Sequence, residues 1–408
     1  MPWYGNVNDI TDPYVVTISP RYLKTRIGEE HDPEEYVKEL ELQNRREGDG
    51  DLETDISQDF RVNLEYILRK VWGYPSFRDG QLDSIKRTLR HESSLLVLPT
   101  GSGKSLSYQL PAYILSKLGI PTLTLVISPM ISLMYDQVKC LPPGLIGACW
   151  TSVEQTTTQF RDFMEKLTSN TIKILFISPE KLQSQSFLSL VRTRKIPPIP
   201  FVCVDEVHCL SEWSHNFRPA YLLLNHVLIS DLKSPCVIGL TGTATEGTKD
   251  SICAMLHIDR SAGVLSGPVI RDNLAMTVSV EADREPALLN LLQSPRFAAM
   301  DAILIYVMRQ AQADALAAFL RVRNFSAESY HAGKSSQDRQ RIQHRFMNDR
   351  IRILVATIAF GLGLNKSNIR SVIHYCLPKS LENYIQEIGR SGRDGEKSYC
   401  HMFLNQDD

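Results

Sequence analysis

Long hydrophobic runs and paired cysteines are missing from this sequence of 408 residues. Crossing a bilayer takes roughly 20 consecutive apolar residues, and no stretch approaches that length, so we expect no membrane partner. The N-terminus, Met1-Pro2-Trp3-Tyr4-Gly5, lacks the basic and apolar regions of a secretory signal peptide. The eight cysteines are scattered without a C-x-x-C pair, which argues against a disulfide framework or a zinc site and favours a cytosolic or nuclear protein.

Net charge is almost absent as well, at −1, but the charges are unevenly distributed. Residues 1–59 hold 6 Lys and Arg against 15 Asp and Glu, whereas residues 60–408 hold 39 against 31. A moderately basic body is compatible with a nucleic-acid partner without establishing one. We interpret 1–59 as an acidic N-terminal extension, which is either solvated and disordered or lies against the basic body and competes with nucleic acid.

From residue 95 onward, short apolar runs alternate with longer amphipathic segments. A chain of this length exceeds one ordinary core, so roughly two domains are expected. The alternation predicts parallel sheets covered by helices on both faces, and therefore an α/β fold. We place the two lobes at 60–270 and 271–408, and we expect a helix at 59–70. Strands are expected at 95–98, 122–127, 172–177, 201–204 and 237–240 in the first lobe, and at 302–306, 326–330, 353–356 and 371–374 in the second.

A phosphate-binding turn is predicted where the first of these strands ends. The stretch Leu98-Pro99-Thr100-Gly101-Ser102-Gly103-Lys104-Ser105 precedes a segment, 106–118, that we expect to be helical. Backbone N–H groups and the dipole at a helix N-terminus suit a phosphate chain. Lys104 would reach the terminal phosphates and the Ser105 hydroxyl would ligate Mg²⁺. The strict P-loop pattern has Gly at the position of Leu98, so the match needs support from elsewhere. Nucleotide contacts are expected from Thr100, Gly101, Ser102, Gly103, Lys104 and Ser105.

An acidic pair follows the strand expected at 201–204. Asp205 is the candidate ligand for Mg²⁺ and Glu206 the candidate base that polarises an attacking water. The alternative is a surface acid pair that caps a following helix. Another strand ends in Thr241-Gly242-Thr243-Ala244-Thr245, whose hydroxyls either relay a change between a nucleotide pocket and a second ligand or form a helix N-cap cluster.

In this order, the three motifs resemble motifs I, II and III of superfamily 2 helicases. The segment Cys209-Leu210-Ser211-Glu212-Trp213-Ser214-His215-Asn216-Phe217-Arg218-Pro219-Ala220-Tyr221 resembles the aromatic-rich loop of RecQ-family DNA helicases, most of all the type 4, Rothmund–Thomson-associated branch. Trp213, His215 and Phe217 offer ring faces on which unpaired bases can stack, at about 1–3 kcal/mol each, and Arg218 adds a cation. Taken alone, aromatic residues at this density are equally compatible with a core.

The resemblance, which covers roughly residues 70–404, implies further site residues. The stretch from Trp72 to Gln81 resembles motif 0, in which Tyr74 would stack on adenine, Gln81 would read its edge and Arg78 would support the site. Segments 128–134 and 177–182 resemble motifs Ia and Ib, which hold the DNA backbone without reading its sequence. The resemblance also implies a catalytic role for His208 and DNA contacts from Ser132 and Thr243.

The other strong motif, 384–395, lies in the second lobe. Arg390 and Arg393 are three residues apart, so both can face one side of a helix, and Arg is suited to stabilising a transferring phosphoryl group. Presented from the second lobe, they would complete the ATP site when the lobes close; the alternative is a surface Arg pair. Resemblance to motif VI favours Arg393 as the arginine finger and Arg390 as its neighbour, although the roles can be exchanged. Residues 355–366 resemble motif V.

The family resemblance implies a helicase core of two RecA-like P-loop domains that uses ATP and Mg²⁺. Such a core moves 3′ to 5′ on single-stranded DNA and unwinds tailed duplex DNA, in repair, recombination or replication and alongside the proteins of those processes. The compartment would be the nucleus, or the cytoplasm of a prokaryote. Two rivals remain: an RNA helicase, and a non-hydrolysing DNA-binding scaffold, against which Lys104, Glu206 and Arg393 argue. The sequence stops after motif VI, so we expect no zinc-binding or winged-helix module within it.

Overall fold

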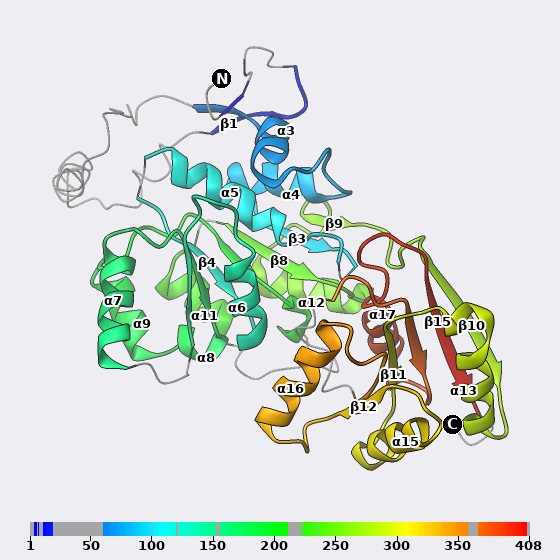
Figure 1. Cartoon of the computed structure of the whole chain (residues 1–408). Coiled ribbons are helices and arrows are strands. Elements are labelled where there is room, and N and C mark those ends of the chain that lie inside the picture. Colours follow the sequence, from blue (N-terminus) through cyan, green and yellow to red (C-terminus); the bar gives the residue numbers. More distant parts are fainter. Residues whose placement is uncertain are drawn as a thin grey trace, which may run out of the picture. The chain divides into compact units, whose positions relative to one another are not determined.

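The computed structural model describes two compact units, each an α/β arrangement around one parallel sheet (Figure 1). Unit 1 comprises Met1–Leu98 and Gly103–Gly267, and unit 2 comprises Pro99–Ser102 and Pro268–Asp408. The two sheets with helices on both faces confirm the predicted fold class. The residues described are 4–5, 7, 11–18, 60–99, 101–119, 121–151, 156–210, 221, 223–234, 236–357 and 366–405.

Unit 1 is built on a seven-stranded sheet in the order β5-β6-β4-β7-β8-β3-β9, in which every neighbouring pair is parallel. Its strands are β3 (Ser94–Val97), β4 (Thr124–Ile127), β5 (Gly147–Trp150), β6 (Ile174–Ile177), β7 (Val202–Val204), β8 (Val237–Thr241) and β9 (Val264–Ser266). The five predicted strands are all present. The two edge strands, β5 and β9, were not predicted because they lack the continuous apolar run of a strand buried on both faces.

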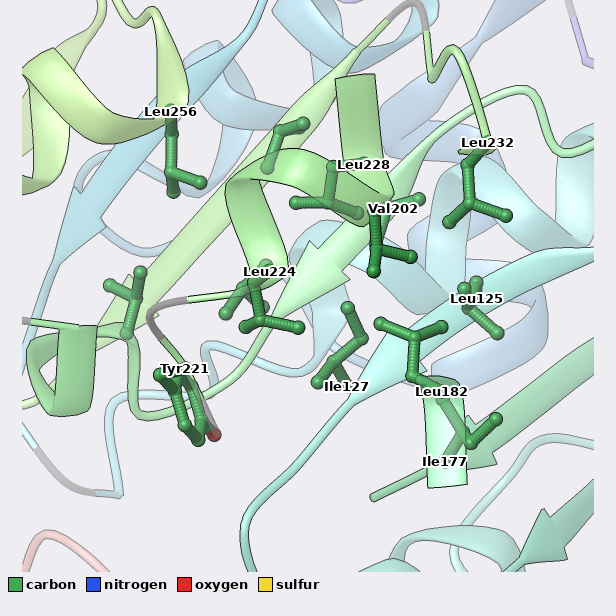
Figure 2. Close-up of a cluster of buried hydrophobic side chains, with 14 of the residues drawn as sticks. Leu125, Ile127, Ile177, Leu182, Val202, Tyr221, Leu224, Leu228, Leu232 and Leu256 are labelled. Carbon is green, nitrogen blue, oxygen red and sulfur yellow. The ribbon is translucent and has the colours of Figure 1, made fainter. Parts of the chain in front are cut away.

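Helices cover both faces of this sheet, since neighbouring residues of each strand enter different cores. Leu96, Val126 and Ile238 face a core that contains α4 and α5, whereas Leu125, Ile127 and Val202 face another, shown in Figure 2, with Leu224 and Leu256 on the covering helices. The α-helices are α3 (Leu64–Ile67), α4 (Gln81–Leu89), α5 (Leu106–Lys117), α6 (Ile131–Lys139), α7 (Thr157–Thr168), α8 (Pro179–Leu182), α9 (Gln185–Arg192), α11 (Leu224–His226) and α12 (Glu246–Leu256).

An antiparallel pair of strands that the sequence analysis did not predict precedes this sheet. Strand β1 (Val15–Ile18) pairs with β2 (Phe60–Asn63), and its residues Val16 and Ile18 are buried in the core of α4 and α5. The interpretation of 1–59 as a solvated or disordered extension is therefore wrong for β1. Residues 19–59 lie outside the described part of the chain.

The helix expected at 59–70 needs a related correction. Residues 60–63 of this range form β2, and α3 begins only at Leu64. The side chain of Asn63, the N-cap of α3, accepts a hydrogen bond from Tyr66 N at 2.9 Å. Asn at an N-cap satisfies a backbone N–H that has no partner within the helix, which fixes where the helix starts. A π-helical turn, Leu68–Trp72, continues α3 to Gly73.

Unit 2 contains a six-stranded sheet in the order β10-β15-β14-β11-β13-β12, again with every neighbouring pair parallel. Its strands are β10 (Leu274–Val280), β11 (Ile303–Tyr306), β12 (Ala327–Tyr330), β13 (Ile353–Ala356), β14 (Ser371–His374) and β15 (Ser398–Leu404). Its helices are α13 (Arg284–Gln293), α14 (Pro295–Ala298), α15 (Gln310–Val322), α16 (Ser336–Met347) and α17 (Leu381–Ile388). The four strands predicted at 302–374 are present, and separate cores on the two faces hold α13 to α15 and α16 with α17.

None of the helices in the described ranges combines the length and the apolar character needed to cross a membrane. All eight cysteines fall within these ranges and are free thiols, and six of them are buried.

The burial of β1 leads to a stability prediction. Replacing Ile18, which is 1% exposed, with Ala leaves a cavity and should cost about 2–5 kcal/mol, seen as a lower urea midpoint for unfolding of unit 1. Thr17 lies in the same strand but is exposed, so Thr17→Ala should cost about 0.5 kcal/mol or less. Equal effects of the two substitutions would show that β1 contributes nothing to the core.

Candidate nucleotide-binding site

The predicted P-loop connects the end of β3 to the start of α5. Leu98 N donates to Thr241 O at 3.1 Å, which fixes the end of β3 against β8. Gly103 has a φ of +82°, a conformation that a side chain would strain. The Lys104 ammonium donates to Leu98 O at 2.9 Å. Lys104 is thus folded back over the start of its own loop, at the N-terminus of α5, where a phosphate chain is favoured.

The residues of motif 0 are linked to the P-loop by Gln81, the first residue of α4. Its Nε2 donates to Gly103 O at 2.9 Å, and its Oε1 accepts from Arg78 N at 2.8 Å. A Cβ at Gly103 would lie 2.8 Å from Gln81 Nε2, so a side chain at this position would displace the Gln81 amide. Gln81 is buried at 3% exposure, whereas Tyr74 is 54% exposed. The structure therefore brings Gln81 to the P-loop and leaves Tyr74 open to a planar ligand.

The acidic pair follows β7 directly, as predicted. Asp205 N donates to Ile127 O at 2.8 Å, and Asp205 Oδ1 accepts from Glu206 N at 3.0 Å. Burial and the neighbouring Glu206 carboxylate raise the pKa of Asp205 to about 7, while the positive charge of Lys104 acts in the opposite direction. The pair therefore shares an electrostatic site with the P-loop lysine, which disfavours the alternative of a surface helix cap.

His208 connects the acidic pair to β8. It is buried at 5% exposure, and its Nδ1 lies 3.0 Å from Thr241 Oγ1 and 3.4 Å from Glu206 Oε2. The Thr241 hydroxyl in turn donates to Thr243 O at 2.8 Å. Glu206 Oε2 is buried and has no hydrogen-bond partner in the described part of the chain. A carboxylate oxygen in that position is suited to accepting a proton from water.

The hydroxyl groups of Thr241, the last residue of β8, and of Thr243 and Thr245 divide between the two interpretations that the sequence left open. Thr241 belongs to the His208 contact, as a relay would require. Thr245 is the N-cap of α12 and accepts a hydrogen bond from Thr248 N at 3.2 Å. Thr243 is half-buried, and its backbone N–H is directed at Thr241 Oγ1 at 3.3 Å.

Two tyrosines that the sequence analysis did not assign to the site lie against it. The Tyr108 hydroxyl donates to Gln137 Oε1 at 3.0 Å. Burial raises the pKa of Tyr108 well above the usual value, with Cys203 and Asp205 adding to the shift and Ser105 opposing it. Tyr221 is fully buried (Figure 2), and its hydroxyl donates to Asp205 O at 3.1 Å. Tyr221 is the last residue of the aromatic-rich segment that begins at Cys209, and its side chain belongs to the core. Nothing in the local sequence separates either tyrosine from an ordinary core aromatic.

The donor groups near Asp205 match what Mg²⁺ prefers, which is oxygen. Asp205 offers a carboxylate and Ser105 a hydroxyl, and Tyr108 interacts with both residues. The carboxylates of Asp205 and Glu206 outnumber the one ammonium of Lys104, so binding of an additional cation is electrostatically favoured.

The predicted arginines lie in the turn after α17, within unit 2. Arg390 is buried at 5% exposure, while Arg393 is half-buried. Burial raises the pKa of Tyr306 well above its usual value, and the guanidinium of Arg390 opposes that shift. Nearby, His374 Nε2 and Glu387 Oε2 lie 2.7 Å apart and are both buried. The two arginines are therefore not a solvated surface pair.

Several predicted site residues fall outside the described part of the chain. They are Thr100 of the P-loop, the four loop residues Trp213, His215, Phe217 and Arg218, and residues 358–365 of motif V. Ser132 lies in α6, but its side chain is not among the described ones. The DNA contacts expected from these residues stay predictions.

Comparisons with known proteins agree with this geometry. Residues 78–251 match the DEAD/DEAH box helicase family, and residues 284–395 match the helicase conserved C-terminal domain. In Arabidopsis thaliana, the ATP-dependent DNA helicase Q-like 5 is 45% identical over 347 residues, which cover 85% of this chain and 37% of that protein. Human ATP-dependent DNA helicase Q4 is 42% identical over 81% of this chain and 28% of its own length. The chain thus spans only about a third of these two relatives.

Bacterial relatives and solved structures extend the comparison. RecQ from Pasteurella multocida is 39% identical over 84% of this chain and 52% of its own length. Among solved structures, the Mycobacterium smegmatis helicase Lhr bound to ssDNA and AMP-PNP has a TM-score of 0.61 at 20% identity, over 83% of this chain and 47% of that one. DEAD-box helicase Mss116 bound to ssRNA and UDP-BeF reaches 0.65 at 17% identity, over 82% and 71%; both likenesses concern the fold. The chain belongs to the RecQ family of ATP-dependent DNA helicases, with the type 4 helicases among its relatives.

Proposed function

We propose that this chain is an ATP-dependent DNA translocase and helicase core that moves 3′ to 5′ on single-stranded DNA. The observation that carries the proposal is the shared electrostatic site of Lys104, Asp205 and Glu206, in which Glu206 Oε2 is buried without a hydrogen-bond partner in the described ranges. Such a set binds phosphates and activates water, which are the two requirements of ATP hydrolysis. The relatives named as DNA helicases support DNA as the nucleic acid.

Each residue of the site has a chemical task under this proposal. The P-loop N–H groups and Lys104, released from Leu98 O, hold the phosphates of ATP, and Glu206 takes a proton from the attacking water. Ser105 and Asp205 would hold Mg²⁺, which supplies positive charge to the phosphates. Arg390 and Arg393 stabilise the charge of the transferring phosphoryl group. Tyr74 stacks on adenine, and the Gln81 amide exchanges its internal bonds for the adenine edge.

The contact between His208 and Thr241 gives hydrolysis a route to the DNA site. A change at Glu206 reaches Thr241 through His208, whose Nδ1 lies 3.4 Å from Glu206 Oε2 and within hydrogen-bond distance of Thr241 Oγ1. It then reaches the backbone of Thr243 through the hydrogen bond that the Thr241 hydroxyl donates. Thr243 and Ser132 are proposed DNA contacts, together with Trp213, His215, Phe217 and Arg218. We further propose that the chain acts in the nucleus, or in the cytoplasm of a prokaryote, with replication or repair proteins as partners.

The first test of the site is Lys104→Ala. Losing the ammonium removes charge stabilisation at the phosphates, so DNA-stimulated ATPase activity should fall by at least about 100-fold, measured as phosphate release. Lys117→Ala, at the exposed far end of the same helix, is the matched control and should retain activity. Retained activity in Lys104→Ala would overturn the site assignment.

A second test separates ATP binding from hydrolysis. Glu206→Gln keeps the size of the side chain but cannot accept the proton, so the rate of hydrolysis should fall by about 100-fold or more while a fluorescent ATP analogue still binds. Glu165→Gln provides the control, because Glu165 is an exposed acid in α7 of the same unit and lies outside the motifs. If wild-type protein binds ATP and DNA without releasing phosphate, the non-hydrolysing scaffold is correct instead.

The choice between DNA and RNA is tested by the activating strand. We expect single-stranded DNA to stimulate the ATPase activity more than RNA of the same sequence, and a duplex with a 3′ tail to be unwound in preference to one with a 5′ tail. The measurements are phosphate release and strand separation by fluorescence. Stronger stimulation by RNA would identify an RNA helicase, and stimulation without strand separation would limit this core to translocation.

A further inference from the structure

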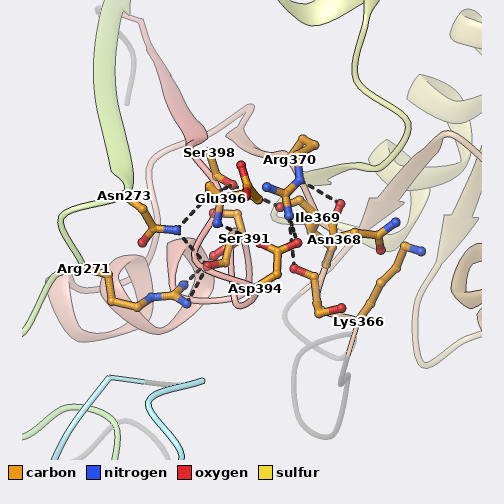
Figure 3. A network of polar contacts seen from close by, with 12 residues as sticks. Arg271, Asn273, Lys366, Asn368, Ile369, Arg370, Ser391, Asp394, Glu396 and Ser398 are labelled. Atoms are coloured by element: carbon orange, nitrogen blue, oxygen red, sulfur yellow. Dashed lines mark hydrogen bonds and ion pairs between the residues drawn. The ribbon is translucent and has the colours of Figure 1, made fainter. Parts of the chain in front are cut away.

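Two side chains of unit 2 hold the turn that carries Arg390 and Arg393. Arg271 donates from Nη1 to Gly392 O and from Nη2 to Gly389 O, at 3.0 Å each, and also to Ser391 O. Asn273 donates from Nδ2 to Gly392 O and to Glu396 O, at 2.8 Å each. Figure 3 shows both side chains reaching into this turn from the segment that precedes β10.

The turn needs such hydrogen-bond donors because it has no regular pattern of backbone hydrogen bonds of its own. It runs from the end of α17 to the start of β15, without regular structure from Gly389 to Lys397. Carbonyl groups at a helix C-terminus lack partners within the helix and carry negative dipole charge. The guanidinium of Arg271 meets both needs, because it is cationic and its donors form a fixed planar fork.

The shape of the turn is fitted to these side chains. Gly392 has a φ of +60°, and a Cβ there would lie 2.6 Å from Asn273 Nδ2 and 2.7 Å from Ser398 Oγ. Two further contacts hold the far side: Gly392 N donates to Ile369 O at 2.9 Å, and Arg370 forms an ion pair with Asp394. The backbone on either side of Arg393 is therefore fixed from two directions.

We propose that Arg271 and Asn273 are positioning residues that hold Arg390 and Arg393 in the geometry needed for phosphoryl transfer. The proposal rests on the proposed ATPase function. Charge stabilisation of a transition state depends on donors that are already in place, and a displacement of about 1 Å can cost about 100-fold in rate. Loosening the turn should therefore lower kcat for ATP hydrolysis and leave the binding of ATP and DNA intact.

The experiment compares Arg271→Lys and Asn273→Asp with a matched control. Lys keeps the charge of Arg271 but not its fork, and Asp is isosteric with Asn yet presents oxygens to two carbonyls. Arg352 is the control, since it also donates to three carbonyls of unit 2, those of Phe297, Ala298 and Met300. We expect kcat at saturating single-stranded DNA to fall about 10- to 100-fold in both test variants, with KM for ATP and DNA affinity unchanged. Arg352→Lys should keep the wild-type kcat.

A double-substitution cycle shows whether the residues act through the arginines. In a background that carries both Arg390→Ala and Arg393→Ala, Arg271→Lys should cause little further loss of kcat, because the groups that it positions are gone. Full additivity would overturn the proposal, as would an unchanged kcat in the folded variants or an equal loss in Arg352→Lys. Asn273→Ala replaces Arg271→Lys if the latter does not fold. If Lys104→Ala abolishes ATPase activity but these variants retain it, this inference fails while the proposed function stands.

Discussion

Burial of both faces of a parallel sheet is the constraint on which the rest of the structure depends. Strands such as β3, β4 and β6 have no exposed residue, so polar side chains are confined to the points where strands end. Parallel strands bring those ends to one edge. Lys104 after β3, Thr241 at the end of β8 and Asp205 after β7 therefore gather at that edge of unit 1 as a consequence of packing.

Gathering these groups also sets their electrostatics. Asp205 and Glu206 are neighbouring acids in a partly desolvated place, with Lys104 as a nearby positive charge. Burial raises the pKa of Asp205 first, and the like charge of Glu206 adds to the shift. The charges of these three residues do not balance one another. The Lys104 ammonium matches the phosphates of a nucleotide complex, and the two carboxylates match its cation.

Sequence patterns predicted the central strands, and the motifs that follow them directly, better than the elements around them, and the reason is physical. Apolar runs between turn residues reveal central strands, and the P-loop and Asp205-Glu206 follow such runs directly, so their placement could be anticipated. Strand β1 was not predicted because its pairing with β2 depends on residues far along the chain, and because the sequence of β2 resembles the start of a helix. Side-chain hydrogen bonds such as those of Tyr108 and Arg271 depend on tertiary approach, which no local pattern encodes.

The β1–β2 pair has one more consequence. Ile18 is paired directly with Phe60, so the two residues that flank the stretch 19–59 are held side by side. When the two ends of a loop are held together, each doubling of its length costs in general only about 0.6 kcal/mol of closure entropy. Folding thus places almost no demand on the length of the acidic stretch, and insertions or deletions there would leave motif 0 and the P-loop where they are.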